Sequence, residues 1–219
     1  MKVILFGATG MVGQGVLREC LVDSGVTNVL SVGRSPLGVE HPKLANLVQK
    51  DLLNYQAAEN ELSDYDACFF CLGATAAGKT EQEYALINHD IPVAVGATLA
   101  RIKPGMTFIY VSGAGTDSTE KGRTMWARVK GKTENALLGL PLNAYMFRPA
   151  AIQPVHGEVS RTPAYRIAIA ALRPVFPALR ALFPGFITTT ERIGRAMLNI
   201  ARSGYPERIL ESRSINLAA

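Results

Sequence analysis

The sequence predicts an α/β protein, with a doubly wound parallel sheet and a small C-terminal helical lobe. Short apolar runs alternate with segments of helical periodicity from the N-terminus to about residue 150. These runs are apolar throughout instead of alternating with polar residues, which is typical of strands covered on both faces. Past Gln153 the alternation stops, and prolines interrupt an apolar stretch that also carries arginines.

Six apolar runs are expected to be strands: 2–7, 27–34, 44–49, 66–73, 105–113 and 142–149. Helical patterns cover 11–24, 81–102, 120–140 and 188–204. Gly25 is expected to stop the first helix, and a threonine cap and a glycine stop bound the last. Pro92 suits a new helix after Asp90, and 207–217 can add a last strand. We expect one domain over 1–219, with 155–186 as a small lobe on its substrate side.

Composition and charge narrow the class of protein. The chain has 219 residues, of which 48% are hydrophobic and 19% charged, as in ordinary globular proteins. Its net charge of +5 comes from scattered basic residues without a nucleic-acid recognition motif. We therefore expect an anionic cofactor and a small-molecule substrate as partners, and no nucleic acid.

No apolar run is long enough to span a bilayer, so we expect no integral membrane segment. The N-terminus leads directly into the strand-like KVILF without the features of a signal peptide, which predicts a cytoplasmic protein. For 163–186 a membrane-surface segment is the alternative, because arginines punctuate an apolar stretch. Its four prolines argue against a long amphipathic helix.

Cys68 and Cys71 form a C-x-x-C spacing that can indicate a redox or zinc site. They lie in an apolar run that reads as a buried strand, where residues three apart point to opposite faces. No second cysteine pair completes a zinc site. We interpret both thiols as small buried hydrophobic groups and expect no metal.

Three evenly spaced glycines in LFGATGMVG follow the first predicted strand. Gly7 permits a tight turn, Gly10 lets the backbone approach a diphosphate, and Gly13 lets the following helix pack against the strand. The helix N-terminus then offers free N–H groups and partial positive charge to phosphates. The G-x-x-G-x-x-G spacing is weak evidence alone. Between the first strand and the first helix of an α/β chain, it predicts a dinucleotide-binding loop.

The end of the second strand indicates which dinucleotide is bound. An acidic residue at this place holds the ribose hydroxyls of NAD, whereas an arginine accommodates the 2′-phosphate of NADP. The sequence here is SVGRS, with Arg34 and Ser35 and no acid. This predicts NADP(H), with NAD(H) also possible. The alternative is a solvated surface arginine without a ligand.

The sequence resembles the short-chain dehydrogenase/reductase superfamily in its extended or atypical branch, which shares the NAD(P)-binding Rossmann fold. It is most similar to the small Tat-interacting-protein-type oxidoreductases and to proteins named NAD-dependent epimerases. The resemblance covers roughly 1–155 and 188–204. It rests on these motifs: FGATGMVG, GR at 33–34, KDL at 50–52, CLGAT at 71–75, YVSGAG at 110–115, WARVKGKTE at 126–134 and FRPA at 147–150.

The resemblance implies two catalytic positions. Ser112 matches the family's catalytic serine, and Lys130 matches the lysine that holds the nicotinamide ribose and lowers the pKa of a tyrosine. The glycine-loop reasoning and the resemblance together give the expected cofactor-binding residues: Gly7, Thr9, Gly10, Met11, Val12, Gly13, Arg34, Ser35, Asp51, Leu52, Leu72, Gly73, Ala74, Lys130, Pro149, Ala151 and Ile152.

The chain departs from the family motif Tyr-x-x-x-Lys, because Trp126 stands four residues before Lys130. An indole does not titrate usefully and cannot replace a phenol as proton donor. Tyr110 is expected too low in the sheet to take over. The proton would come from water or from His156, which follows FRPAAIQP. An imidazole is suited to proton transfer near neutral pH, although a single histidine in a polar loop is commonly solvated. Ser112 is expected to orient the carbonyl, or only to cap the turn after its strand.

The helix that carries Lys130 has an apolar stripe running from Trp126 to Leu140. Lys130 lies at the margin of this stripe, where ribose hydroxyls are a natural partner for its charge. The alternative is a snorkelling lysine with its ammonium in water. Trp126 either packs in the core or lies beside the nicotinamide.

These observations lead to a main functional hypothesis: an NADP(H)-binding oxidoreductase that acts on an unknown small carbonyl or alcohol. One alternative is a non-catalytic, NADP(H)-responsive regulatory protein that lost the acid. A nucleotide-sugar epimerase is less favoured, because that reaction also uses the missing tyrosine. The helices over 81–102 and 120–140 can pair between subunits, as in related proteins, so a homodimer is possible.

Overall fold

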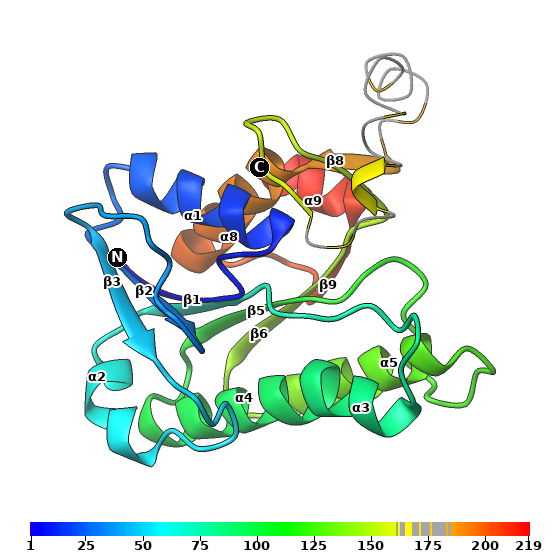
Figure 1. Ribbon diagram of the computed structural model, residues 1–219, viewed down its shortest axis with the longest axis horizontal. Coiled ribbons are helices and arrows are strands. Elements are labelled where there is room, and N and C mark those ends of the chain that lie inside the picture. Colours follow the sequence, from blue (N-terminus) through cyan, green and yellow to red (C-terminus); the bar gives the residue numbers. More distant parts are fainter. Residues whose placement is uncertain (161, 163–164, 168–170, 172–175, 177–182, 184) are drawn as a thin grey trace.

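Seven parallel strands form the central sheet, in the order β3-β2-β1-β4-β5-β6-β9 (Figure 1). The computed structural model describes residues 1–160, 162, 165–167, 171, 176, 183 and 185–219. The strands are β1 (Lys2–Phe6), β2 (Asn28–Gly33), β3 (Leu44–Val48), β4 (Ala67–Phe70), β5 (Thr107–Val111), β6 (Asn143–Arg148) and β9 (Ile209–Glu211). The strand order reverses between β1 and β4, which opens a crevice at the carboxyl ends of the strands. The predicted doubly wound α/β fold is confirmed.

Helices cover both faces of this sheet (Figure 1). On one face lie α1 (Met11–Val22), α8 (Thr190–Ser203) and α9 (Ser212–Ala218). On the other lie α2 (Glu59–Ser63), α3 (Glu81–Ala85), α4 (Ile91–Ile102) and α5 (Met125–Leu138). A 3₁₀ turn over Gln56–Ala58 precedes α2, and a π-helical turn over Leu86–Asp90 joins α3 to α4. A separate parallel pair consists of β7 (Ala151–Gln153) and β8 (Ile187–Thr189).

Each face of the sheet has its own apolar core, because successive residues of the strands point to opposite sides. In β1, Val3 and Leu5 belong to the core under α1 and α8, and Ile4 and Phe6 to the core under α4 and α5. The C-x-x-C pair follows the same rule. Cys68 lies in the second core and Cys71 packs against the first, so the two thiols are on opposite faces, and burial raises the pKa of both.

Close packing of α1 against α8 depends on one glycine from each helix. A Cβ added at Gly15 would lie 2.5 Å from the Cβ of Thr190, and one at Gly194 would lie 2.7 Å from the Cγ of Glu19. The α8 helix begins as predicted at a threonine cap, where Thr189 Oγ1 accepts from the backbone N–H of Arg192 at 3.0 Å. This packing places the N-terminal turn of α8 beside the middle of α1.

Two sequence predictions differ from the structure because tertiary contacts decide the local conformation. The helix predicted over 120–140 begins only at Met125. The preceding loop is held by Asp117, whose carboxylate accepts from the backbone N–H groups of Thr119 and Gly122. The predicted strand 207–217 is a strand only over Ile209–Glu211 and then becomes α9. In α9 the buried residues Ser212, Ile215 and Ala218 recur every three positions, a helical spacing.

The described part of the chain contains no helix long and apolar enough to cross a membrane. Most of the predicted lobe over 155–186, including the segment for which a membrane-surface role was the alternative, lies outside the described residues. The division into one domain with this lobe therefore stays a prediction.

Candidate functional site

The glycine loop connects β1 to α1 at the carboxyl edge of the sheet. Gly7 has φ +79°, and a Cβ there would lie 2.5 Å from the backbone nitrogen of Leu72. A Cβ at Gly13 would lie only 2.1 Å from the carbonyl oxygen of Gly7, so the start of α1 touches the backbone of the loop. Both positions therefore require glycine.

Gly10 differs from these two glycines. Its φ of −81° is open to any residue, and a Cβ there would meet nothing closer than the Gly7 carbonyl oxygen at 3.4 Å. Gly10 is also the N-cap of α1, and no side chain caps this helix. The helix N-terminus therefore has free N–H groups beside open space. This combination fits a diphosphate.

A pocket extends from this loop to the end of β2. Arg34 and Ser35 follow β2 directly, and both are exposed where they line the pocket. No acidic side chain lines the pocket among the described residues. Its lining includes six of the expected cofactor residues: Gly7, Thr9, Arg34, Ser35, Leu52 and Leu72. Asp51 lies outside it and uses its carboxylate to accept from the backbone N–H of Leu53 at 2.9 Å.

The side chain of Asn88, which sequence analysis did not identify, binds the loop after β4 at Ala74. Asn88 is fully buried in the π-helical turn. Its side-chain oxygen accepts from the Ala74 N–H at 3.2 Å, and its amide donates to the Tyr84 carbonyl at 3.0 Å. Gly73 and Ala74 are thus fixed at the floor of the crevice. A π-helical turn often marks a functional site, but it gives no sequence signal.

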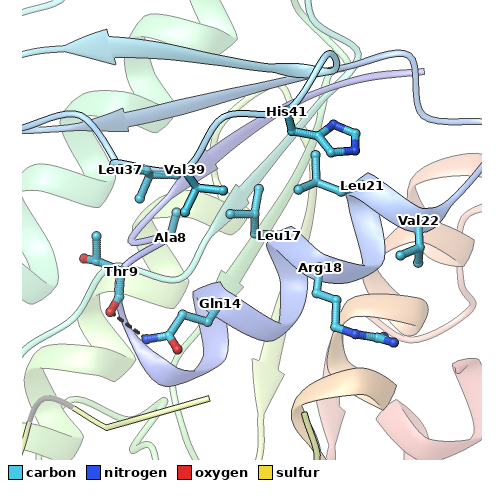
Figure 2. Close-up of a pocket in the computed structure, with 10 residues that line it drawn as sticks. All are labelled: Ala8, Thr9, Gln14, Leu17, Arg18, Leu21, Val22, Leu37, Val39 and His41. Atoms are coloured by element: carbon cyan, nitrogen blue, oxygen red, sulfur yellow. Dashed lines mark hydrogen bonds between the residues drawn. The ribbon is translucent and has the colours of Figure 1, made fainter. Parts of the chain in front are cut away.

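A second, larger pocket adjoins the first along the outer side of α1 (Figure 2). Ala8, Thr9 and Leu37 line both pockets. Figure 2 shows Leu17 and Leu21 of α1 facing Leu37, Val39 and His41 of the loop between β2 and β3. Gln14 closes one end, where its amide donates to the Thr9 carbonyl at 3.0 Å. The walls are mostly apolar, in contrast with the polar pocket at Arg34.

The third part of the site lies where β5 and β6 end, and buried charges define it. Ser112 follows β5, and its hydroxyl donates to Glu134 Oε1 at 2.5 Å. Glu134 is completely buried on α5 and is also bound by the guanidinium of Arg148, whose Nε lies 3.1 Å from both carboxylate oxygens. This charge-assisted pair raises the pKa of Arg148. We refer to Ser112, Glu134 and Arg148 as the buried cluster.

Lys130 lies one helical turn before Glu134 and is half-buried. Its ammonium donates to the backbone carbonyl of Ser112 and lies 6.0 Å from the centre of the Tyr110 ring. Burial lowers the pKa of Lys130 to about 8, and the nearby Glu134 carboxylate opposes this by raising it. Ser112 and Lys130 are therefore brought together at one edge. Sequence reasoning did not identify Glu134, although its spacing of four from Lys130 was visible.

Two aromatic side chains near Lys130 have different surroundings. Tyr110 is buried, and its hydroxyl donates to the backbone carbonyl of Asn88 at 3.0 Å. Burial raises the pKa of this phenol far above its usual value. Trp126 is half-buried, and its ring lies beside Gly115, where an added Cβ would meet Cη2 at 3.4 Å. Trp126 thus covers the loop after β5 and does not enter the central core.

His156 lies on the other side of the site and is exposed. Its Nε2 is 2.9 Å from Glu191 Oε2 on α8, and its backbone N–H donates to Glu158. The neighbouring Val159 exchanges hydrogen bonds with the Gln14 side chain of α1. His156 therefore belongs to the α1–α8 face, whereas Lys130 comes from a helix on the opposite face of the sheet (Figure 1).

The segment after β6 connects these two sides. The Pro149 carbonyl accepts from the Ala114 N–H at 3.0 Å, which continues the pairing of β5 with β6 beyond the strands. Ala151 and Ile152 then pair with β8. Pro149 is thus beside the loop after Ser112, and the other two residues lead toward α8.

Comparison with known proteins identifies the family. The model of a family described as NAD(P)H-binding matches residues 7–154. The chain belongs to this NAD(P)H-binding family. Among its relatives, "Protein fmp52-2, mitochondrial" of Aspergillus terreus is 26% identical over 205 residues, which cover 91% of this chain and 82% of that protein. "Leucinostatins biosynthesis cluster protein T" of Purpureocillium lilacinum is 29% identical over 122 residues, or 54% of this chain and 45% of the relative.

Solved structures support the same fold. The enzyme WbmF of Bordetella bronchiseptica in complex with NAD+ is 15% identical, with a TM-score of 0.68 over 99% of this chain and 76% of that one. UDP-glucuronic acid 4-epimerase of Bacillus cereus in complex with NAD is also 15% identical, with a TM-score of 0.68 over 96% of this chain and 78% of that one. At this identity the likeness shows the NAD(P)-binding Rossmann fold and confirms the predicted resemblance at that level.

The predicted cytoplasmic location is wrong, because relatives from three fungi are named as mitochondrial proteins. The prediction used the lack of a secretory signal, which bears only on secretion. It does not distinguish one compartment from another, since targeting sequences are read by receptors and leave no mark on the fold.

Proposed function

We propose that the protein is an NADP(H)-dependent oxidoreductase that acts on a small carbonyl or alcohol. One observation carries the choice of cofactor: Arg34 and Ser35 directly follow β2 and line a pocket that has no acidic side chain among the described residues. A guanidinium and a hydroxyl at that place suit a 2′-phosphate, whereas the ribose hydroxyls of NAD call for a carboxylate. The open space at Gly10 and the uncapped start of α1 fit the diphosphate.

The bound cofactor would supply or accept the hydride, and the chain would bind and orient the reactants. Lys130 would hold the nicotinamide ribose, and the segment from Pro149 to Ile152 would lie against the nicotinamide. The substrate would enter beside the loop after Ser112. The Ser112 hydroxyl already donates to Glu134, so its direct role would be to shape the edge of the site.

Calorimetric titration with NADPH and NADH tests the choice of cofactor. Wild type is expected to bind NADPH at least about tenfold more tightly than NADH. This ratio corresponds to the binding free energy of roughly one charge-assisted contact. Arg34→Ala is expected to lose this difference while keeping its affinity for NADH. Lys50→Ala, in the loop after β3, removes a cation that lies outside the pocket lining and serves as control. Equal binding of both nucleotides by wild type would contradict NADP(H) specificity.

A non-catalytic, NADP(H)-responsive binding protein is the second candidate, and Trp126 at the tyrosine position favours it. Turnover of a panel of aldehydes and ketones with NADPH distinguishes the two. Binding without any turnover supports the regulatory protein. Epimerisation of a nucleotide sugar is a third candidate, because a neighbour in fold is a UDP-glucuronic acid 4-epimerase. The missing phenol argues against it.

Pairing between subunits through α4 and α5 would make a homodimer. A mitochondrial location is a separate proposal, supported by the names of the fungal relatives. Analytical ultracentrifugation tests the first point. Fractionation of the source cells tests the second.

A further inference from the structure

We propose that Lys130 is the proton-transferring group of this site, held in place for that role by the buried cluster of Ser112, Glu134 and Arg148. The inference rests on the proposed oxidoreductase function and supplies the acid that Trp126 cannot provide. It assigns Lys130 a step in the reaction in addition to the binding of ribose.

The other polar groups near this edge are already engaged. The Tyr110 phenol is buried and donates to the Asn88 carbonyl. The Ser112 hydroxyl has one proton, which it gives to Glu134 at 2.5 Å. His156 is paired with Glu191 on the opposite face of the sheet. Among the described residues at the end of β5, Lys130 is the titratable group that still has N–H bonds without an acceptor.

The position of Lys130 supports this role. Its ammonium donates one hydrogen to the Ser112 carbonyl, immediately past the last residue of β5. Two further N–H bonds have no acceptor among the described residues. The ring of Trp126, one turn earlier on α5, covers the adjacent loop at Gly115. A substrate oxygen beside this loop would be within reach of the free N–H groups.

The surroundings of Lys130 set its pKa in a range where the side chain can both lose and regain a proton. Glu134 faces it from the same helix, and the Tyr110 phenol faces it from β5. Behind Glu134 stand the Arg148 guanidinium from β6 and Glu211 from β9, which is 3.8 Å from Arg148. Burial lowers the pKa of Lys130 to about 8, so both protonation states are accessible near neutral pH.

The proposed step balances. In the reducing direction the carbonyl carbon of the substrate would gain a hydride, which a bound cofactor would supply. The carbonyl oxygen takes a proton from the Lys130 ammonium, so that one N–H bond breaks and one O–H bond forms. The neutral amine then regains a proton from water. In the oxidising direction the neutral amine accepts the alcohol proton.

Titration of Lys130 in the protein without cofactor tests the proposal independently of turnover. The signals of lysine labelled with ¹³C at Cε are followed by NMR, and Lys130→Arg assigns the signal by its disappearance. Wild type is expected to titrate near pH 8. Glu134→Gln removes the carboxylate that favours the ammonium form of Lys130. In this variant Lys130 is expected to titrate about one pH unit lower than in wild type.

Glu211→Gln is the matched control, because it removes a more distant carboxylate that does not contact Ser112 or Lys130. Its midpoint is expected to stay at the wild-type value. A wild-type midpoint near the ordinary 10.5 of lysine overturns the proposal, and this measurement decides even where Glu134→Gln does not fold.

Turnover provides the second arm. Lys130→Arg keeps a cation that can hold ribose hydroxyls, but a guanidinium does not release a proton near neutral pH. We expect NADPH affinity to stay within about threefold of wild type and kcat to fall about 100-fold. Full kcat in Lys130→Arg overturns the proposal. Absence of NADPH binding by wild type overturns the proposed function instead, and the NMR midpoint of Lys130 separates the two failures.

Discussion

The two halves of the site are built in different ways. In the amino-terminal half, formed by β1, α1 and β2, the backbone makes the site: Gly7 and Gly13 bring the loop and helix together, and Gly10 leaves open space. In the carboxyl-terminal half, formed by β5, α5 and β6, buried side chains make it. There Glu134 links Ser112 to Arg148 across separations of 22 and 14 residues.

This difference predicts which substitutions in each half lower the stability of the fold and which weaken only the binding of the cofactor. A backbone-defined cradle fails when a methyl group is added in the wrong place. The buried carboxylate of α1, Glu19, faces α8, where it pairs with Arg195, and takes no part in the glycine loop. A side-chain cluster fails when one partner is removed, because the remaining charge is left unpaired in the interior. A partly exposed ion pair, such as that of His156 with Glu191 beside α1 and α8, is screened by water, so breaking it costs less than breaking a buried pair.

The largest expected loss of stability comes from Glu134→Ala. It leaves the Arg148 guanidinium and the Ser112 hydroxyl without their shared acceptor, at a site with no exposed surface on the Glu134 side chain. We expect the free energy of unfolding, measured in urea, to fall by about 4 kcal/mol. Glu211→Gln removes an exposed partner of the same arginine and should change it by less than about 0.5 kcal/mol. Equal effects of the two substitutions would mean that burial does not set the cost of removing a partner of Arg148.

Gly13→Ala is expected to have the next largest effect. The added methyl would lie 2.1 Å from the Gly7 carbonyl oxygen, so the helix must move away from β1. We expect a loss of about 3 kcal/mol in unfolding free energy, despite the better helix propensity of alanine.

Gly10→Ala is the matched control, because its methyl meets nothing closer than 3.4 Å. Its unfolding free energy should stay within about 0.5 kcal/mol of wild type, while NADPH binding weakens about tenfold because the methyl occupies the space expected for the diphosphate. A Gly13→Ala protein as stable as Gly10→Ala would contradict the close approach of loop and helix.

The geometry of the amino-terminal half could be predicted from the sequence, because the residues that determine it are close together along the chain. Gly7, Gly10 and Gly13 lie within seven consecutive residues, and the strand pattern around them identifies their setting. Arg34 directly follows the second strand, so its place at the crevice also followed from the order of elements. The fold class was predictable for the same reason: continuous apolar strands and intervening helices permit few arrangements.

The carboxyl-terminal half was only partly predictable. Ser112 and Lys130 were identified through a family motif. The spacing of four between Lys130 and Glu134 was visible, but the contacts of Glu134 with Ser112 and Arg148 are tertiary and could not be predicted from that spacing. Asn88 acts from a π-helical turn, where its side chain binds a loop fourteen residues earlier. The role expected for His156 depended on the path of the chain after β6. The structure places this residue against α8, a contact set by the packing of α8 on α1.

The smallest expected effect comes from the exposed pair of His156 and Glu191. The hydrogen bond from His156 lowers the pKa of the Glu191 carboxyl below its usual 4.5, and Arg195 adds to this. A lowered pKa means that the folded state favours the ionised carboxylate. The stabilisation is therefore present above about pH 4.5 and is lost as the pH falls through the folded pKa.

Urea unfolding of wild type and Glu191→Gln at several pH values measures this term. Both side chains are partly exposed, so we expect a difference of about 0.5 kcal/mol at pH 6 that disappears as the pH falls through the lowered pKa of Glu191. The Glu134→Ala difference should remain several times larger at pH 6, because water does not screen that pair. A Glu191 pair as costly to break as the buried cluster would mean that burial is not what separates the two sides of this site.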